Sequence, residues 1–148
     1  MESQSIAIPF RRNVLGTRLQ VCFPEDRACK LAAVNLWYHV GSKNEVAGRT
    51  GFAHLFEHLM FEPSKHFGTT YFELLQRAGG QINGSTSTDR TNYWELVPSN
   101  ALELALWMES DRMMHMLPSL TATAFETQRD VVLNERRQNY ENRPYGLA

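Results

Sequence analysis

The sequence predicts an α+β fold, with helices packed on one face of a mixed, largely antiparallel sheet. Three observations support this fold class. Short stretches in which apolar residues alternate with polar ones are typical of half-buried strands. Segments with helical periodicity follow the early strands and fill the last part of the chain. No repeat, low-complexity run or linker divides residues 1–148, so we expect a single domain.

Two strands are expected before the first helix. One spans residues 14–23, with Gly16 at a turn just inside its start. The other spans residues 32–40, where every second side chain lies on an apolar face. This alternation makes His39 a strand side chain rather than a metal ligand. Residues 41–50 are expected to form a polar loop.

Four helices and a β-hairpin are expected in the remainder. Glycine, proline and capping residues mark their limits. The third helix begins at a cap on Ser99 or Asn100 and is broken by Pro118, and the fourth is capped by Thr121 or Thr123. The expected helices are residues 51–61, 69–78, 99–116 and 123–142, and the hairpin strands are residues 81–87 and 91–97.

The third helix is expected to be buried between layers, because its first half is apolar on all sides. Its three methionines are expected to fill the core rather than to bind a cofactor or metal. They are Met113, Met114 and Met116.

The segment His54-Leu55-Phe56-Glu57-His58 is the most informative part of the sequence. On a helix, His54 and His58 project from the same face, where two imidazoles can bind one Zn²⁺. Glu57 lies near that face, within reach of a water on the metal. The pattern H-x-x-E-H is the inverzincin signature. Apolar neighbours favour burial, and buried histidines and glutamate need partners, which a metal provides.

A catalytic zinc ion usually has three protein ligands and one open position. Glu135 is the candidate third ligand, because helical spacing puts it on the same face as Phe125 and Val132, the face expected to turn toward the core. A salt bridge from Glu135 to a nearby arginine is the alternative. The arginines in question are Arg129, Arg136 and Arg137.

These residues resemble the zinc site of the pitrilysin–insulysin–mitochondrial processing peptidase family of inverzincins. The likeness extends from about Asn13 to the last residue. Residues 40–45 are similar to the family's approach to the zinc helix, and residues 80–93 to its active-site edge strand and hairpin. Residues 134–137 and 144–146 are similar to the segment around the third ligand in bacterial members.

The resemblance implies a zinc-dependent endopeptidase, of which this chain is the front part of a pitrilysin-type metallopeptidase domain. Zn²⁺ would be held by His54, His58 and Glu135 and would activate a water. Glu57 would act as the general base in the hydrolysis of a peptide bond.

The resemblance also implies a substrate-binding edge. An extended peptide or unfolded protein would lie as an added strand against Gly84, Ser85 and Thr86. From the residues alone, the same segment could equally be a plain polar edge strand.

The chain departs from the family pattern in two ways. Gln128 stands where active relatives commonly carry a second glutamate. Its amide can orient a ligand by hydrogen bonding but adds no negative charge near the metal. The chain is also shorter than a family domain, so we expect a C-terminally incomplete N-terminal domain. A second homologous domain or a partner subunit would complete the enzyme, and this chain alone would be a weak or inactive peptidase.

Two other classes of function remain open. The chain could belong to a non-catalytic subunit that keeps the fold, although such partners often lose the metal ligands. It could also be a zinc-stabilised module that binds peptides without cutting them. The neutral Gln128 keeps this second alternative open.

Composition excludes some classes of partner. A net charge of −1 and the absence of a Lys/Arg block predict no nucleic-acid partner. No apolar run is long enough for a transmembrane segment. Residues 1–12 lack the features of a signal peptide, so a soluble protein of the cytoplasm or periplasm is expected. The two cysteines, Cys22 and Cys29, form no C-x-x-C pair and suggest no disulfide scaffold.

Overall fold

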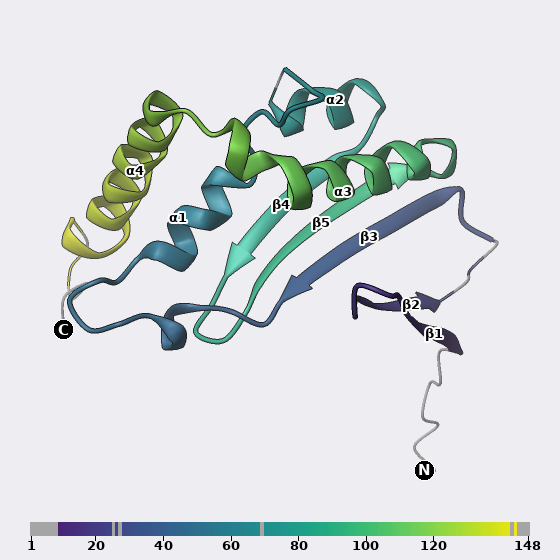
Figure 1. Ribbon diagram of the computed structural model, residues 1–148, viewed down its shortest axis with the longest axis horizontal. Helices are drawn as coiled ribbons and strands as arrows, with labels where there is room; N and C mark the ends of the chain where they lie inside the picture. Colours follow the sequence, from purple (N-terminus) through teal and green to yellow (C-terminus); the bar gives the residue numbers. More distant parts are fainter. Residues whose placement is uncertain (1–8, 25, 27, 69, 143, 145–148) are drawn as a thin grey trace, which may run out of the picture. The chain divides into compact units, whose positions relative to one another are not determined.

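The computed structural model describes residues 9–24, 26, 28–68, 70–142 and 144 (Figure 1). The chain forms two compact units, Met1–Lys30 and Leu31–Ala148. The first unit holds strands β1 (Phe10–Val14) and β2 (Gln20–Pro24). The elements of the second are, in order, β3 (Leu31–Tyr38), η1 (Ser42–Asn44), α1 (Phe52–Leu59), α2 (Tyr71–Arg77), β4 (Gln81–Thr86), β5 (Thr91–Pro98), η2 (Ser99–Ala101), α3 (Leu102–Ser119), α4 (Ala122–Arg136) and the π-helical turn η3 (Arg137–Glu141).

The first unit is an antiparallel hairpin of β1 and β2. The expected single strand at residues 14–23 is therefore wrong. The chain reverses at residues 15–19, where the Arg18 amide donates to the Leu15 carbonyl at 2.8 Å. Arg18 has a φ of 68°, a left-handed conformation that turns the chain and that alternation of side chains does not reveal. Both cysteines of this unit are free thiols, Cys22 and Cys29.

The sheet of the second unit has three antiparallel strands in the order β3–β5–β4. Val34 and Ile82 both pair with Glu95, so these three side chains share one face of the sheet. Along β3, half-buried residues alternate with exposed ones, which confirms the predicted pattern. β4 forms the predicted hairpin with β5 and lies at an edge of the described sheet.

Helices α1, α2 and α3 pack on one face of this sheet, which confirms the α+β class (Figure 1). The core lies where α2 and α3 meet β5. Helix α4 buries no residue completely and packs against α1. The expectation that Phe125 faces the core is therefore wrong, because α4 covers α1 and not the sheet, and Phe125 stays 36% exposed. The core residues are Phe67, Tyr71, Leu75, Val97, Ala101, Ala105 and Met108.

The third helix is longer than expected. Helix α3 continues to Ser119 and contains Pro118. A proline in the last turn removes only one hydrogen bond, so the helix ends just after it rather than before it. Thr121, one of the two expected caps, begins α4, since its Oγ1 accepts from the Ala124 amide at 3.1 Å. None of the described helices is both long and apolar enough to cross a membrane.

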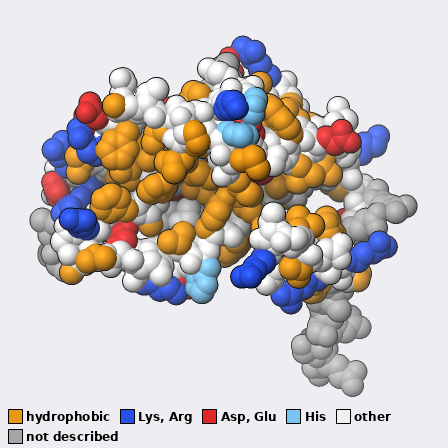
Figure 2. Space-filling view, viewed as in Figure 1, with side chains coloured by type: hydrophobic (Ala, Val, Ile, Leu, Met, Phe, Trp, Pro, Cys, Tyr) orange, Lys and Arg blue, Asp and Glu red, His pale blue; other side chains and the backbone are white. Residues whose placement is uncertain are grey.

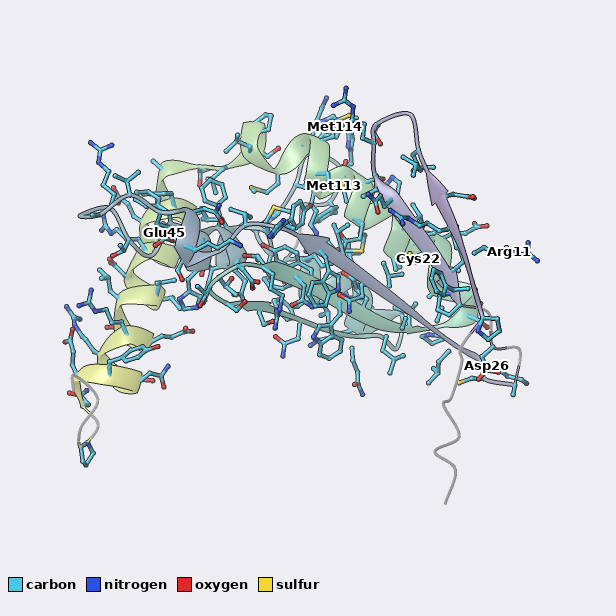
Figure 3. The ribbon with its side chains drawn as sticks, turned by 90° about the horizontal axis from the view of Figure 1, so that it is seen from below. Arg11, Cys22, Asp26, Glu45, Met113 and Met114 are labelled. Atoms are coloured by element: carbon cyan, nitrogen blue, oxygen red, sulfur yellow. The ribbon has the colours of Figure 1, made fainter. Side chains whose placement is uncertain are left out.

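Helix α3 is buried on one side only. Met116 belongs to the buried residues, but Met113 and Met114 are 44% and 71% exposed (Figure 3). Leu106 and Trp107 are also exposed. A helix that covers one face of a sheet has one side to bury. Burial between layers was therefore a wrong expectation, and of the three methionines only Met116 fills the core.

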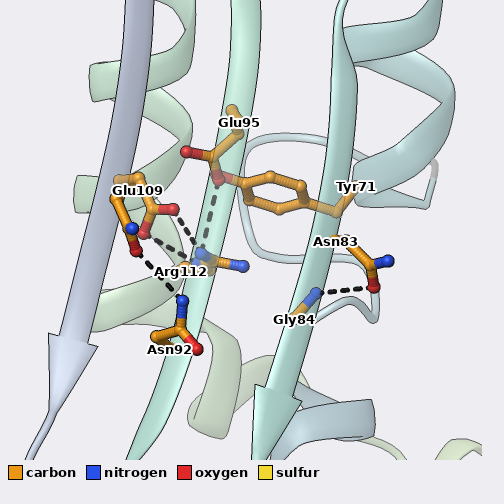
Figure 4. A network of polar contacts seen from close by, with 8 residues as sticks. Tyr71, Asn83, Gly84, Asn92, Glu95, Glu109 and Arg112 are labelled. Atoms are coloured by element: carbon orange, nitrogen blue, oxygen red, sulfur yellow. Dashed lines mark hydrogen bonds and ion pairs between the residues drawn. The ribbon is translucent and has the colours of Figure 1, made fainter.

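A buried ion-pair network joins α3 to the sheet (Figure 4). Arg112 is 1% exposed, and its Nε donates to Glu109 Oε2 at 2.9 Å while its Nη2 lies 3.5 Å from Glu95 Oε1. The guanidinium carbon lies 4.4 Å from the ring centre of Tyr71 and 4.3 Å from that of Tyr93. Two carboxyl groups and the rings of Tyr71, Tyr93 and, at 5.8 Å, Phe61 thus surround the cation in place of water.

The charge of Glu95 is disfavoured in this network. The pKa of Glu95 is raised to about 9, first by burial and then by the Glu109 carboxylate, whereas Arg112 and the Tyr71 hydroxyl act to lower it. A protonated Glu95 leaves one negative charge, on Glu109, to balance the charge of Arg112.

We expect Glu95→Gln to flatten the dependence of stability on pH. The pKa of Glu95 rises from an ordinary value of 4.5 to about 9 on folding. Its contribution to stability is therefore fully present below the ordinary value and is lost as pH rises toward the folded value. Urea unfolding of the wild type should show a free energy of unfolding that falls by several kcal/mol as pH rises across this range.

The glutamine variant keeps the shape of the side chain without the titration, so its unfolding free energy should change less over the same pH range. Glu103→Gln, at an exposed position of α3, is the matched control and should follow the wild type. Equal slopes in the Glu95→Gln variant and the wild type would contradict the assignment.

Candidate metal centre

Helix α1 carries the whole motif at residues 54–58, and two features set where it begins. Gly51 precedes the helix with a φ of 97°, in the left-handed region that favours glycine. Glu45, on the preceding loop, accepts hydrogen bonds from the amides of Gly51 and Ala53, both at 2.8 Å. The carboxylate satisfies amides that have no partner within the helix and opposes the positive end of the helix dipole.

Two histidines of α1 meet a glutamate of α4. The Nε2 atoms of His54 and His58 are 3.3 Å apart, and Glu135 Oε2 lies 3.4 Å from the first and 3.6 Å from the second. The side chain of His58 is 19% exposed, and those of His54 and Glu135 are 40% and 39% exposed. The three expected ligands therefore converge at a point that solvent can reach.

The separations of these three atoms suit a tetrahedral metal ion. Ligand atoms about 2.0–2.2 Å from Zn²⁺ in a tetrahedron lie about 3.3–3.6 Å from one another. The observed triangle has this size, so the donors fit the ion as they stand. Two nitrogens and one oxygen leave the fourth position for water or a substrate.

The arginines close to Glu135 have other partners. Among the described residues, none of them forms an ion pair with Glu135, so the salt-bridge alternative is not what the structure contains. Arg129 pairs with Asp130, Arg136 with Glu141, and Arg137 donates to Asn134 Oδ1.

A hydrogen-bonded chain through Gln128 and Glu62 orients the His58 ring at the nitrogen that is not part of the triangle. Its Nδ1 lies 3.3 Å from Gln128 Oε1, and Gln128 Nε2 donates to Glu62 Oε1 at 2.6 Å. With the proton on Nδ1, which faces an acceptor, the lone pair of Nε2 points to the metal position. Glu62 was missed in the sequence, although its position four residues after His58 was an available signal.

Glu57 lies where α1 passes closest to β4. A Cβ atom added to Gly84 would come within 3.3 Å of Glu57 Cγ and 3.1 Å of Phe61 Cζ. Glycine at this position lets the strand approach the helix without displacing either side chain. The predicted base and the predicted substrate strand are therefore neighbours.

Two of the three ligands, His54 and Glu135, line a cleft of about 840 Å³ together with residues of α4 and η3. Thr86 at the end of β4 also lines it. Ser85 donates to Asn92 at 2.7 Å and Thr86 Oγ1 lies 3.3 Å from Thr91 Oγ1, so both hydroxyls are engaged within the sheet. The backbone edge of β4 remains unpaired in the described sheet.

A mainly apolar pocket of about 480 Å³ lies beside α1 but contains none of the metal ligands.

The other histidines lie outside this triangle. His39 follows β3 directly, and its Nε2 lies 3.3 Å from Lys43 Nζ. The sequence did not indicate that the remaining two would form a second group of potential ligands with an aspartate. That group is His66, Asp111 and His115.

Comparisons with known proteins show which family this chain resembles. A family model described as insulinase (peptidase family M16) matches residues 20–145. The zinc protease PqqE of Helicobacter pylori is 33% identical over 149 residues, which cover 99% of this chain and 33% of that protein.

Solved structures are also similar. A protease from Helicobacter pylori has a TM-score of 0.87 and 32% identity, covering 95% of this chain and 34% of that one. Pitrilysin has a TM-score of 0.78 and 26% identity, covering 91% of this chain and 14% of that one. The present chain thus spans about a third of the length of the Helicobacter pylori relative, 33% by sequence.

We expect Glu45→Ala to destabilise the protein by about 1–2 kcal/mol, because it removes both hydrogen-bond acceptors from the start of α1. Glu45→Gln keeps one acceptor oxygen and should lose about half as much. Urea unfolding measures both. Glu126→Ala, at an exposed position of α4, is the control and should change stability by less than about 0.5 kcal/mol. If Glu45→Ala behaved like the control, the loop carboxylate would have no capping role.

Proposed function

Since the chain belongs to the insulinase family of peptidases, family M16, we propose that it provides the zinc centre of a metalloendopeptidase. The observation that carries the proposal is the triangle of His54, His58 and Glu135, whose separations of 3.3–3.6 Å suit Zn²⁺ without rearrangement. The similarity to a protein named as a zinc protease supports the choice of metal.

The chain's own residues have distinct parts in the proposed hydrolysis. His54, His58 and Glu135 hold the ion. Zinc, when bound, supplies Lewis-acid chemistry that polarises a peptide carbonyl and lowers the pKa of water to about 7. Glu57 takes the proton of the attacking water and passes it to the leaving amine.

The peptide would bind in extended form along the free edge of β4, beside Gly84, Ser85 and Thr86. The Gly84 amide donates to Asn83 Oδ1 at 2.8 Å and would exchange this hydrogen bond for one to the peptide. Two observations support this site. Gly84 brings the strand against Glu57, and Thr86 lines the same cleft as His54 and Glu135. The occupied hydroxyls of Ser85 and Thr86 favour recognition of the substrate backbone over its side chains.

Gln128 would serve as a positioning residue for His58. Its oxygen faces the His58 ring and its amide nitrogen donates to Glu62. A glutamate at position 128 would place two carboxylates side by side, and they would repel each other unless they shared a proton. The neutral amide therefore suits a chain that carries Glu62, and the negative charge that the family commonly has at position 128 is present here on Glu62.

The substrate enclosure would come from outside this chain. The 148 residues cover 33% of the first relative, and the proposed edge site pairs only one side of a peptide. Ordering a flexible peptide against one edge buries little surface to offset the loss of entropy. We therefore propose that peptides or unfolded proteins are cut only when a second homologous domain or a partner subunit closes the cleft, and that the chain alone is weak or inactive.

We expect Glu57→Gln to bind zinc like the wild type in the full-length protein while losing about 10²–10⁴-fold in kcat, because an amide cannot accept the proton. Hydrolysis of a fluorogenic peptide and metal analysis of the same preparations measure the two properties. Glu135→Gln should instead lose zinc, because a carboxylate ligand is removed.

The two variants separate the base from the ligand. Glu73→Gln removes a carboxylate from α2, away from the proposed ligands, and should keep both properties. Wild-type hydrolysis by Glu57→Gln would refute the proposed base. Zinc binding without hydrolysis in the wild type would instead support a zinc-stabilised peptide-binding module.

We expect Gln128→Leu to weaken zinc binding by about 10–100-fold, because His58 loses the acceptor that fixes its tautomer and ring orientation. Competition with a chelating dye measures the zinc dissociation constant. Gln76→Leu, at an exposed position of α2, is the matched control and should bind zinc like the wild type. An unchanged affinity in Gln128→Leu would remove the proposed positioning role.

A further inference from the structure

A second cluster of metal-ligating side chains lies outside the centre described above. His66, Asp111 and His115 each offer one ligand atom, and these atoms all lie within 4.8 Å of one another. His66 belongs to the segment between α1 and α2, and the other two lie on α3. Figure 2 shows histidine side chains together at the surface over α2 and α3.

Two of the three potential ligands are placed by helix geometry. Asp111 and His115 are four residues apart on α3, so they project from the same face one turn apart. The rings of His66 and His115 meet edge to face with centroids 4.8 Å apart. Both imidazoles therefore face the same carboxylate.

The loop that carries His66 is held against the core. Ser64 and Phe67 pair across it as an isolated bridge, and Ser64 Oγ donates to the Asp111 carbonyl at 3.5 Å. Phe67 is 4% exposed and packs on the ring of Tyr71 with centroids 5.7 Å apart. His66 thus needs little further ordering to act as a ligand, and this lowers the entropic cost of binding.

The carboxylate of Asp111 has an unused oxygen. Its side chain is 3% exposed, and Oδ1 is engaged by His66 Nδ1. Asp111 Oδ2 is buried and has no hydrogen-bond partner among the described residues. A buried carboxylate oxygen without a donor is costly, and a cation between the carboxylate and the two rings would satisfy it.

We propose that His66, Asp111 and His115 form a second metal site that takes Zn²⁺ or a similar late divalent transition metal. Two imidazoles and a carboxylate are a common donor set for such ions. The His66 side chain is 46% exposed and gives the ion an entry path. The bound ion would tie the loop of residues 64–67 to α3, a role in stability that is separate from hydrolysis.

His115 is the reason to propose a metal ion rather than a simple ion pair between His66 and Asp111. One histidine is sufficient to pair with one aspartate, yet two rings converge on Asp111. Each neutral imidazole has one N–H donor and one lone pair, whereas a metal ion would use the lone pairs of both rings together with the unpartnered Asp111 Oδ2. Insertion of the ion would open the direct His66–Asp111 contact, because ligand atoms of one zinc ion lie about 3.3–3.6 Å apart.

The test counts zinc ions in the full chain at free zinc buffered in the micromolar range. The wild type should bind two ions per chain. His66→Gln and His115→Gln should each bind one, and His58→Ala should bind one through the second site alone. His66→Gln combined with His58→Ala should bind none.

A matched control and a second measurement keep the test independent of folding defects. His39→Gln removes a histidine from neither cluster and should still bind two ions. With a chelator present, His66→Gln should melt at the wild-type temperature. Added zinc should raise the melting temperature of His58→Ala but not that of His58→Ala with His66→Gln. A single zinc per wild-type chain that His58→Ala removes, or a second zinc that survives His66→Gln and His115→Gln, would overturn the proposal.

Discussion

The buried positive charge of Arg112 is the constraint on which the sheet and its covering helices depend. An unpaired charge at this position would cost several kcal/mol, so each of its partners is held in place. One of them, Phe61, lies beside Gly84 at the position where β4 passes Glu57. The network therefore helps to position residues beside the proposed base Glu57 as well as residues of the core. Its partners are Glu109 on α3, Glu95 and Tyr93 on β5, Tyr71 on α2 and Phe61 after α1.

Helix α4 depends on a different kind of contact. It has no fully buried residue, and its polar links to the α1 region are the approach of Glu135 to two histidines and the hydrogen bonds of Gln128. An ion bound by α1 and α4 together would add its binding free energy to their association. In such an arrangement the zinc centre and the packing of α4 stabilise each other, and the loss of either weakens the other.

The two clusters of potential ligands have the same local geometry but lie in different surroundings. Each has a pair of ligands one helical turn apart and a third ligand from another segment. In the first, the third ligand is a half-exposed glutamate beside an open cleft, which suits a metal that must meet a substrate. In the second, a buried aspartate lies against the loop of residues 64–67, which is held in place by other contacts. Such surroundings suit a metal ion with a structural role.

The sequence by itself determined the features that depend on local geometry. The spacing of His54, Glu57 and His58 places them on one helix face wherever that helix lies, and alternation identified β3. Periodicity also assigned Glu135 to its helix face. It could not show that this face covers α1 instead of the core, nor that Glu135 meets His58 across 77 positions of sequence. Such meetings are decided by tertiary packing.

Four features became visible only in the structure. They are the turn at Arg18, the exposure of Met113 and Met114, the role of Glu62 as an acceptor, and the second cluster. The turn depends on the backbone conformation of Arg18. The other features share one physical reason, since side-chain periodicity states which residues share a face but not which other segment covers it.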